Sequence, residues 1–235
     1  MGASPSVARC TDTERLDPRT ARSRQALREA LAAEVRATGD LNRVTVTAVA
    51  NRAGVTRRTF YSHFRDIPSL VEAVEAELVS GVAARLRTIA NARLVQMVGI
   101  VTSNEPVPGS VELLEYVRSN AVVFQALLGK GGDPALREKI QDAAHEIIAP
   151  RALTGIDVGA AAFFDYYITY AISAEMAVLM RWLGEGMRES CEVMARIMTM
   201  LTFVRPGDLY GFPVSIDIPA YSSALMQMEE DSHDR

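Results

Sequence analysis

The stretch from residue 45 to residue 64, TVTAVANRAGVTRRTFYSHF, has the length and punctuation of two short helices joined by a turn. Thr45 and Thr56 each stand directly before a helical segment, where a threonine hydroxyl can accept a hydrogen bond from the first turn. Gly54 can adopt the left-handed conformation that ends the first helix. The small side chain of Ala50 lets a second helix cross closely. This spacing predicts a helix-turn-helix.

The second of these helices has an apolar face and a polar face. At about 100° per residue, Phe60 and Phe64 fall together, and the opposite face is centred on Ser62 with Arg58 and Thr59 beside it. Arginine can pair with guanine in the major groove of DNA, and threonine can contact thymine. The polar face favours DNA binding, although a solvated helical pair in any all-α domain also carries such residues.

Charge is distributed unevenly along the 235-residue chain. Residues 1–65 contain 12 Arg against 6 Asp and Glu, whereas residues 66–235 contain 13 Lys and Arg against 23 Asp and Glu. A small basic segment on a larger acidic one indicates a polyanionic partner for the basic segment. Chance scatter is the alternative reading of this difference.

Helical periodicity covers most of the chain and predicts an all-α protein. A long helix is expected to begin at Asp66 or Ile67, because Pro68 is tolerated in a first turn. Its expected buried face consists of Val71, Val74, Leu78, Val82, Leu86 and Ile89. We expect a flexible arm at 1–18, a helix-turn-helix DNA-binding domain at 19–65, a helical domain at 66–204 with loops at 103–110, 129–134 and 149–157 and last helices at 158–183 and 189–204, and an irregular tail at 205–235.

Composition limits the class of protein. With 49% apolar residues the chain can form a sizeable core, and Cys10 and Cys191 lack metal-ligand spacing. The most apolar long segment, 158–183, is interrupted by charges, and the N-terminus lacks a signal-peptide pattern. We therefore expect a cytoplasmic protein. Only His145 has acids nearby on one helix, and a surface histidine is the better interpretation, so we expect neither an enzyme nor a metal or cofactor.

The same stretch closely resembles the DNA-binding segment of the TetR family of bacterial transcriptional repressors, T-x-x-x-I-A-x-x-A-G-V-S-x-x-T-(L/F)-Y-x-(Y/H)-F. The family usually continues with a lysine that contacts a phosphate, and here Ile67 occupies that position. The loss should lower DNA affinity unless Arg65 replaces the lysine. The matching positions are Thr45, Val49, Ala50, Ala53, Gly54, Val55, Thr56, Thr59, Phe60, Tyr61, His63 and Phe64.

Roles in DNA binding follow from the polar face and from this resemblance. We expect Arg57, Arg58 and Thr59 to contact bases, with Thr47 as an additional candidate. Phosphate contacts or helix capping are expected from Thr45, Thr56, Tyr61, Ser62 and His63.

The resemblance implies that residues 66–204 bind an unknown small-molecule effector and form a homodimer on a double-stranded DNA operator. Two apolar stripes suit a four-helix interface or, equally, an internal core: Val193, Ile197, Met200 and Val204, and Ala174, Val178 and Trp182. Aromatic and methionine side chains are candidates for the effector pocket, although packing is the commoner use of such residues. These candidates are Met97, Tyr116, Phe124, Phe164, Tyr167, Tyr170 and Met176.

These expectations describe a repressor that a small molecule releases from its operator. Effector binding would swing the long helix that begins near Pro68 and change the separation of two DNA-binding domains. The alternative, motivated by the departure at Ile67, is a ligand-binding or protein-interaction module that has lost DNA binding.

Overall fold

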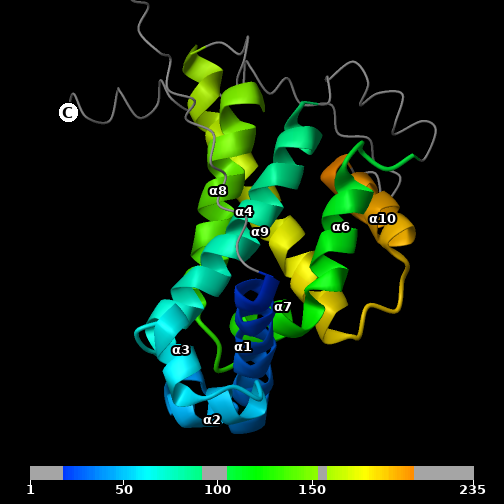
Figure 1. Ribbon diagram of the computed structural model, residues 1–235. Helices are drawn as coiled ribbons and strands as arrows, with labels where there is room; N and C mark the ends of the chain where they lie inside the picture. The colour runs from blue at the N-terminus through cyan, green and yellow to red at the C-terminus, as the bar shows by residue number, and fades with distance from the viewer. Residues whose placement is uncertain (1–17, 92–104, 153–157, 204–235) are drawn as a thin grey trace, which may run out of the picture.

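A computed structural model describes residues 18–91, 105–152 and 158–203, and all regular structure in these ranges is helical (Figure 1). Three helices form a small head, and the remaining helices form a larger body around a long central helix. The elements are α1 (Pro18–Thr38), the short 3-10 helix η1 (Leu41–Arg43), α2 (Val46–Arg52), α3 (Arg57–His63), α4 (Ile67–Ala90), α6 (Ser110–Ser119), α7 (Ala121–Leu128), α8 (Pro134–Ala152), α9 (Val158–Gly184) and α10 (Cys191–Phe203).

The predicted helix-turn-helix is confirmed in α2 and α3. The Thr45 hydroxyl accepts a hydrogen bond from the Ala48 amide at 3.2 Å, and the Thr56 hydroxyl accepts one from the Thr59 amide at 3.1 Å. Gly54 has φ of +67°, a left-handed conformation that strains any residue with a Cβ atom. The two caps and this glycine therefore fix where α2 ends and where α3 begins.

The long helix α4 begins where the sequence predicts. Asp66 accepts a hydrogen bond from the Ser69 amide at 2.8 Å, and the Ser69 hydroxyl accepts one from the Asp66 amide at 3.1 Å. This reciprocal capping box places Pro68 in the first turn, where its missing N–H has no cost. The predicted face is buried as far as Leu86, and Ile89 is half-buried.

The body surrounds α4 and supports the head. Helix α8 packs along α4, α6 packs on α4 and α10, and α1 of the head packs on α7 (Figure 1). One hydrophobic core therefore runs from Leu27 and Phe60 in the head to Phe124 and Trp182 in the body. None of the helices among the described residues is long and apolar enough to cross a membrane.

The expected loop at 149–157 is wrong in its first part, because α8 continues through Pro150 to Ala152. Pro150 cannot donate a backbone hydrogen bond to the Glu146 carbonyl, and only Arg151 and Ala152 follow it in the helix. The Arg151 guanidinium also donates to the Ile147 carbonyl at 2.9 Å and stabilises this end. The last helix begins at Cys191, two residues later than expected. Residues 1–17 of the expected arm at 1–18 and the whole expected tail at 205–235 lie outside the described residues, and Pro18 already belongs to α1.

Of the two expected apolar stripes, one is divided between core and surface. Trp182 is buried in the core of its own chain, and its indole N–H donates to the Glu189 carbonyl at 3.3 Å. Ala174 on the same helix is exposed, and Val178 is half-buried. The internal-core alternative therefore holds for Trp182, while Val193, Ile197 and Met200 of the other stripe face outward and Val204 lies outside the described residues.

Candidate nucleic-acid interface

Two arginines project from the first turn of α3. Arg57 and Arg58 are both exposed, and neither makes a hydrogen bond or an ion pair with the described residues. On the other face of the same helix, Phe60 is fully buried and contacts Phe64, with ring centroids 6.0 Å apart. Core packing therefore fixes the orientation of the helix and leaves two positive charges in solvent.

Hydroxyl groups on α3 and at its N-terminal cap make hydrogen bonds within this segment. The Thr56 and Thr59 hydroxyls share a hydrogen bond at 2.9 Å, and the Ser62 hydroxyl donates to the Thr59 carbonyl at 2.7 Å. Thr56 is thereby a cap, and Thr59 is half-buried beside it. The methyl group of Thr59 and the free lone pairs of these oxygens are what a DNA ligand could contact.

The remaining DNA-contact candidates lie around α3. Tyr61 is exposed and its ring meets Phe60 edge-on at 5.6 Å, while His63 is half-buried against Phe64 at 6.2 Å. Thr47 is exposed in the first turn of α2, next to the Thr45 cap. The structure therefore brings all nine predicted DNA-contact residues onto α2, α3 and their caps.

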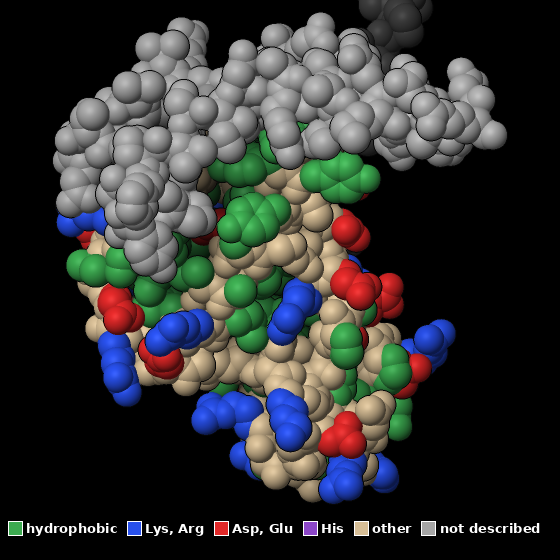
Figure 2. Space-filling model, turned by 180° about the vertical axis from the view of Figure 1, so that it is seen from behind, with side chains coloured by type: hydrophobic (Ala, Val, Ile, Leu, Met, Phe, Trp, Pro, Cys, Tyr) green, Lys and Arg blue, Asp and Glu red, His purple; other side chains and the backbone are tan. Residues whose placement is uncertain are grey.

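Other cations of the head are partly neutralised. Arg52 forms an ion pair with Glu34 at 2.5 Å, and Arg43 lies 3.7 Å from Asp40. Lys and Arg side chains surround the end of the molecule that the head forms (Figure 2). Arg57 and Arg58 of α3 are therefore among the exposed head arginines that form no ion pair with the described residues.

The junction between α3 and α4 shows whether a neighbouring cation can replace the lysine that is absent at Ile67. Ile67 is half-buried and packs against the core, so it supplies no charge. The Arg65 guanidinium lies 3.1 Å from the Asp66 carboxylate. The Ser69 amide and then Arg65 lower the pKa of Asp66 by hydrogen bonding, so this carboxylate stays ionised beside Arg65.

The predicted effector-pocket residues fall into separate places. Tyr116 and Phe124 meet edge-to-face at 6.2 Å between α6 and α7, and Met176 is buried on α9. Phe164 is half-buried, whereas Tyr167 and Tyr170 are 44% and 69% exposed. Met97 lies outside the described residues. Two surface hollows, one along α10 and one beside residues 128–141, contain none of these side chains.

His145 lies beside an acidic side chain, Cys191 is buried, and Cys10 lies outside the described residues. The His145 imidazole lies 2.9 Å from the Asp165 carboxylate and joins α8 to α9. Cys191 is a buried free thiol, and burial raises its pKa. In the described ranges, no three His, Cys, Asp or Glu side chains are grouped as metal ligands.

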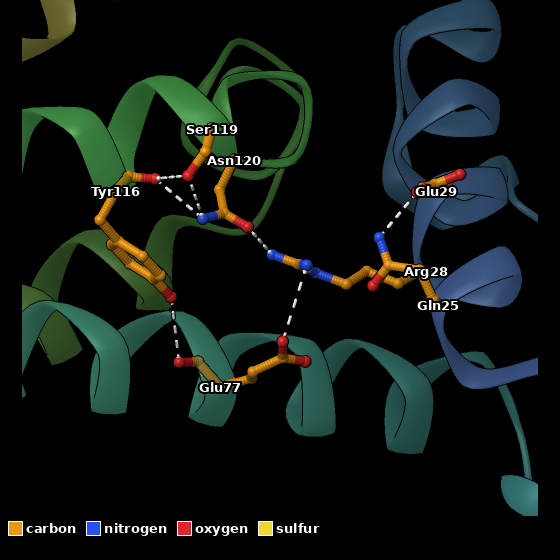
Figure 3. A network of polar contacts seen from close by, with 7 residues as sticks. All are labelled: Gln25, Arg28, Glu29, Glu77, Tyr116, Ser119 and Asn120. Carbon is orange, nitrogen blue, oxygen red and sulfur yellow. Dashed lines mark hydrogen bonds and ion pairs between the residues drawn. The ribbon is translucent and has the colours of Figure 1, made fainter. Parts of the chain in front are cut away.

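A polar network centred on the buried Arg28 joins the head to the body, and the sequence interpretation missed it (Figure 3). Arg28 of α1 is only 7% exposed, and its guanidinium donates to the Asn120 side-chain oxygen at 2.5 Å. A second nitrogen lies 3.6 Å from the Glu77 carboxylate of α4. The Asn120 amide donates in turn to the Tyr116 carbonyl at 2.8 Å, and the Tyr116 hydroxyl donates to the Glu77 carbonyl at 3.3 Å. One head residue thus contacts both α4 and the junction of α6 with α7.

A second connection uses the loop between α7 and α8. The Leu41 amide of the head donates to the Gly131 carbonyl at 2.7 Å. Gly131 has φ of +84°, and a Cβ atom there would overlap the Gly39 carbonyl. The body therefore contacts the head through polar groups at two places, the Arg28 network and the Leu41–Gly131 hydrogen bond.

The fold and the α3 surface define a helix-turn-helix DNA-binding transcriptional regulator with a helical C-terminal region. Comparison with known families agrees: residues 30–74 match the bacterial regulatory proteins of the tetR family, and residues 104–203 match a transcriptional regulator C-terminal region. The chain belongs to the TetR family. No individual curated protein gives a significant match.

Proposed function

We propose that the protein is a dimeric repressor that leaves its operator when a small molecule binds to the body. The observation that carries the DNA-binding half of this proposal is the unpaired, exposed pair Arg57 and Arg58 on a helix anchored by Phe60. A short helix with free guanidinium groups suits the major groove, where arginine can form two hydrogen bonds with guanine.

The residues around this pair divide by what their groups can reach. Arg57, Arg58 and the Thr59 methyl group are assigned to bases, with Thr47 as an additional base contact. The exposed Tyr61 hydroxyl, the Ser62 hydroxyl and the His63 imidazole are assigned to phosphates, because they flank the arginines on α3. Thr45 and Thr56 act chiefly as caps that hold α2 and α3 in place.

Dimerisation is proposed through the outward faces of α9 and α10. Four apolar side chains of α10, Val193, Ile197, Met200 and Leu201, are between 38% and 52% exposed in the single chain. Tyr166 and Tyr170 project from α9, and apolar side chains gather on the face shown in Figure 2. Large apolar side chains grouped in this way favour a protein partner. A second copy would bury them and present two heads, which need a separation of about 34–36 Å for successive turns of DNA.

Effector response is proposed to travel through the Arg28 network. Tyr116 and Phe124, two of the effector-pocket candidates, adjoin Asn120, and Asn120 holds Arg28 of the head. A ligand that displaces Tyr116 would move Asn120 and Glu77 together and release or rotate α1. This supplies two states that a ligand can favour differently, as a coupling between sites requires.

DNA binding is tested with fluorescently labelled duplexes that cover the DNA flanking the protein's own gene. The parent is expected to bind one duplex with affinity that falls as salt rises, and Arg58→Gln is expected to weaken that binding about 10- to 100-fold. Arg188→Gln, an exposed arginine of the body, should leave affinity unchanged. Absence of binding at low salt, or equal affinity of Arg58→Gln, would favour the module without DNA binding.

Effector response needs a separate experiment. Native mass spectrometry of the purified protein, followed by denaturing extraction, identifies any small molecule that co-purifies. That compound, added to the protein–DNA complex, is expected to release the labelled duplex. A compound that binds the protein and leaves the complex intact would argue against operator release.

A further inference from the structure

The end of the recognition helix α3 lacks the cation that the family places at the start of α4. Ile67 occupies that position and packs against the core. The nearest arginine in sequence, Arg65, pairs with the Asp66 carboxylate. A phosphate approaching Arg65 would also approach this ionised carboxylate, which repels it.

A different arginine lies beside this end of α3. The guanidinium carbon of Arg24, on α1, lies 5.4 Å from the centroid of the Phe64 ring. Phe64 is the C-terminal cap of α3 and stands three residues before Ile67. Arg24 is exposed, and it forms no ion pair with a carboxylate of the described residues. An exposed guanidinium that has no ion pair with the described residues therefore lies beside the C-terminal cap of α3.

We propose that Arg24 contacts a DNA phosphate at the C-terminal end of α3 and takes the place of that lysine. The inference rests on the proposed DNA binding. A guanidinium held against the Phe64 ring keeps its N–H donors in its own plane, where they can reach a phosphate. Because the ring restricts the side chain in the free protein, less conformational entropy is lost when the phosphate binds.

Arg24 and Arg28 lie on the same helix, α1, but in different environments. Arg28 is buried and held by Asn120 and Glu77, so its guanidinium is not available to DNA. Arg24 lies one helical turn before Arg28 and is turned toward Phe64 instead. The proposal therefore assigns the two residues separate tasks, phosphate contact for Arg24 and head–body connection for Arg28.

The test measures how DNA affinity depends on salt. The parent, Arg24→Gln, Arg24→Lys and the double variant Arg24→Gln with Ile67→Lys are titrated with an operator duplex and a scrambled duplex between about 50 and 200 mM salt. Arg87→Gln is the matched control, because this exposed arginine lies about 30 Å along α4 from Ile67.

Arg24→Gln is expected to reduce the slope of log K against log salt by about 1 and to weaken binding about fivefold at roughly 0.15 M salt. Both duplexes should be affected equally, since a phosphate contact carries no sequence information. Arg24→Lys should keep the parental slope, and Ile67→Lys should restore it in the double variant. Arg87→Gln should behave as the parent.

A parental slope in Arg24→Gln, or a loss restricted to the operator duplex, would overturn the role of Arg24 while leaving DNA binding intact. A parent that binds neither duplex at low salt would instead overturn the proposed DNA binding, and the inference with it. Circular dichroism of each variant confirms that it retains its helices.

Discussion

Glu75 is an acidic residue in an apolar environment on α4. Its side chain is 1% exposed, and one carboxylate oxygen accepts a hydrogen bond from the Lys139 ammonium at 2.6 Å. The other oxygen is buried and has no hydrogen-bond partner among the described residues. Burial is the main cause that raises the pKa of Glu75, and Lys139 opposes this shift. The ion pair therefore joins α4 to α8, and removing Lys139 alone would leave the Glu75 charge buried without a partner.

Lys139→Met is expected to destabilise the fold by about 2 kcal/mol at neutral pH, because an unpaired carboxylate stays buried. The cost should be smaller near pH 5. A folded-state pKa above the ordinary value of 4.5 for a glutamate means that the folded protein binds more protons, so stability falls as pH rises from about 4.5 through the raised pKa. Removing Lys139 enlarges that fall. Urea unfolding followed by circular dichroism at both pH values measures it.

The control for this prediction is Arg137→Met, an exposed residue of the same helix, which should change stability little. The double variant Lys139→Met with Glu75→Gln should recover most of the lost stability, since the glutamine amide leaves no unpaired charge in the core. A cost of Lys139→Met that is equal at both pH values would contradict the assignment.

Residues of the head differ in how far sequence reveals their roles. The caps Thr45 and Thr56, and the division between Phe60 and Arg58, follow from local spacing and were predicted. Arg28 was missed, although a charge next to Leu27 on the apolar face of α1 was a signal. Its partner Asn120 lies 92 positions away, and a helical pattern does not identify a contact at that distance.

At the scale of elements, α4 and α6 pack closely where Gly81 of α4 faces Tyr116 of α6. Gly81 lies in the middle of α4, and a Cβ atom there would overlap the hydroxyl and ring of Tyr116. Tyr116 has little freedom to withdraw, because Arg85 stacks on its ring at 4.1 Å and Phe124 meets it edge-on. The small residue therefore sets how closely α6 approaches the helix that leads to the head.

Gly81→Ala is expected to destabilise the protein by about 1–3 kcal/mol through overpacking. In a free helix the same change stabilises by about 1 kcal/mol, so the sign of the effect distinguishes packing from helix propensity. Gly184→Ala is the matched control, because nothing lies near that Cβ position, and it should be neutral or stabilising. Urea unfolding curves measure both.

A second substitution makes the Gly81 prediction specific. If Tyr116 is the obstacle, Gly81→Ala should cost less in a Tyr116→Leu background than in the parent, as a double-mutant cycle reports for residues in contact. Additive effects, or a Gly81→Ala variant as stable as the parent, would show that α4 and α6 separate without cost.

Element boundaries show which sequence signals decide them. The starts of α2, α3 and α4 were predicted because a side-chain cap marks each one. The end of α8 was not, because Pro150 and the apolar residues before it give opposite indications, and packing against α4 and α9 continues the helix. Tertiary contacts decide a boundary where local signals conflict.

At the scale of the whole molecule, the sequence predicted the helices but did not determine which face of each helix packs against the others. Tyr167 and Tyr170 were grouped with Phe124 because all are aromatic, yet the structure places the tyrosines at the surface and Phe124 in the core. Which face of α9 turns inward depends on α7, α8 and α10 together. The partner proposed for the outward face of α10 is a second molecule, and helical periodicity within one chain does not distinguish such an interface from an internal core.

Ile197→Glu tests the proposed dimer at that face. The parent is expected to sediment as a dimer, and the variant as a monomer, with the dissociation constant raised at least about 100-fold, because an unpaired carboxylate is costly to bury. The exposed position makes folding insensitive to the change, so circular dichroism and the fluorescence of the buried Trp182 should match the parent. Analytical ultracentrifugation and these spectra measure both expectations.

DNA provides the decisive comparison for Ile197→Glu. A duplex with two half-sites should bind the variant much more weakly than the parent, whereas a single half-site should bind both equally, because each α3 surface remains intact. Val122→Glu, an exposed valine of α7 outside this face, should leave the dimer and both affinities unchanged. A variant that stays dimeric would move the interface away from α10. Equal loss on both duplexes would instead indicate damage to the head, and the Arg28 network would be the route by which it travelled.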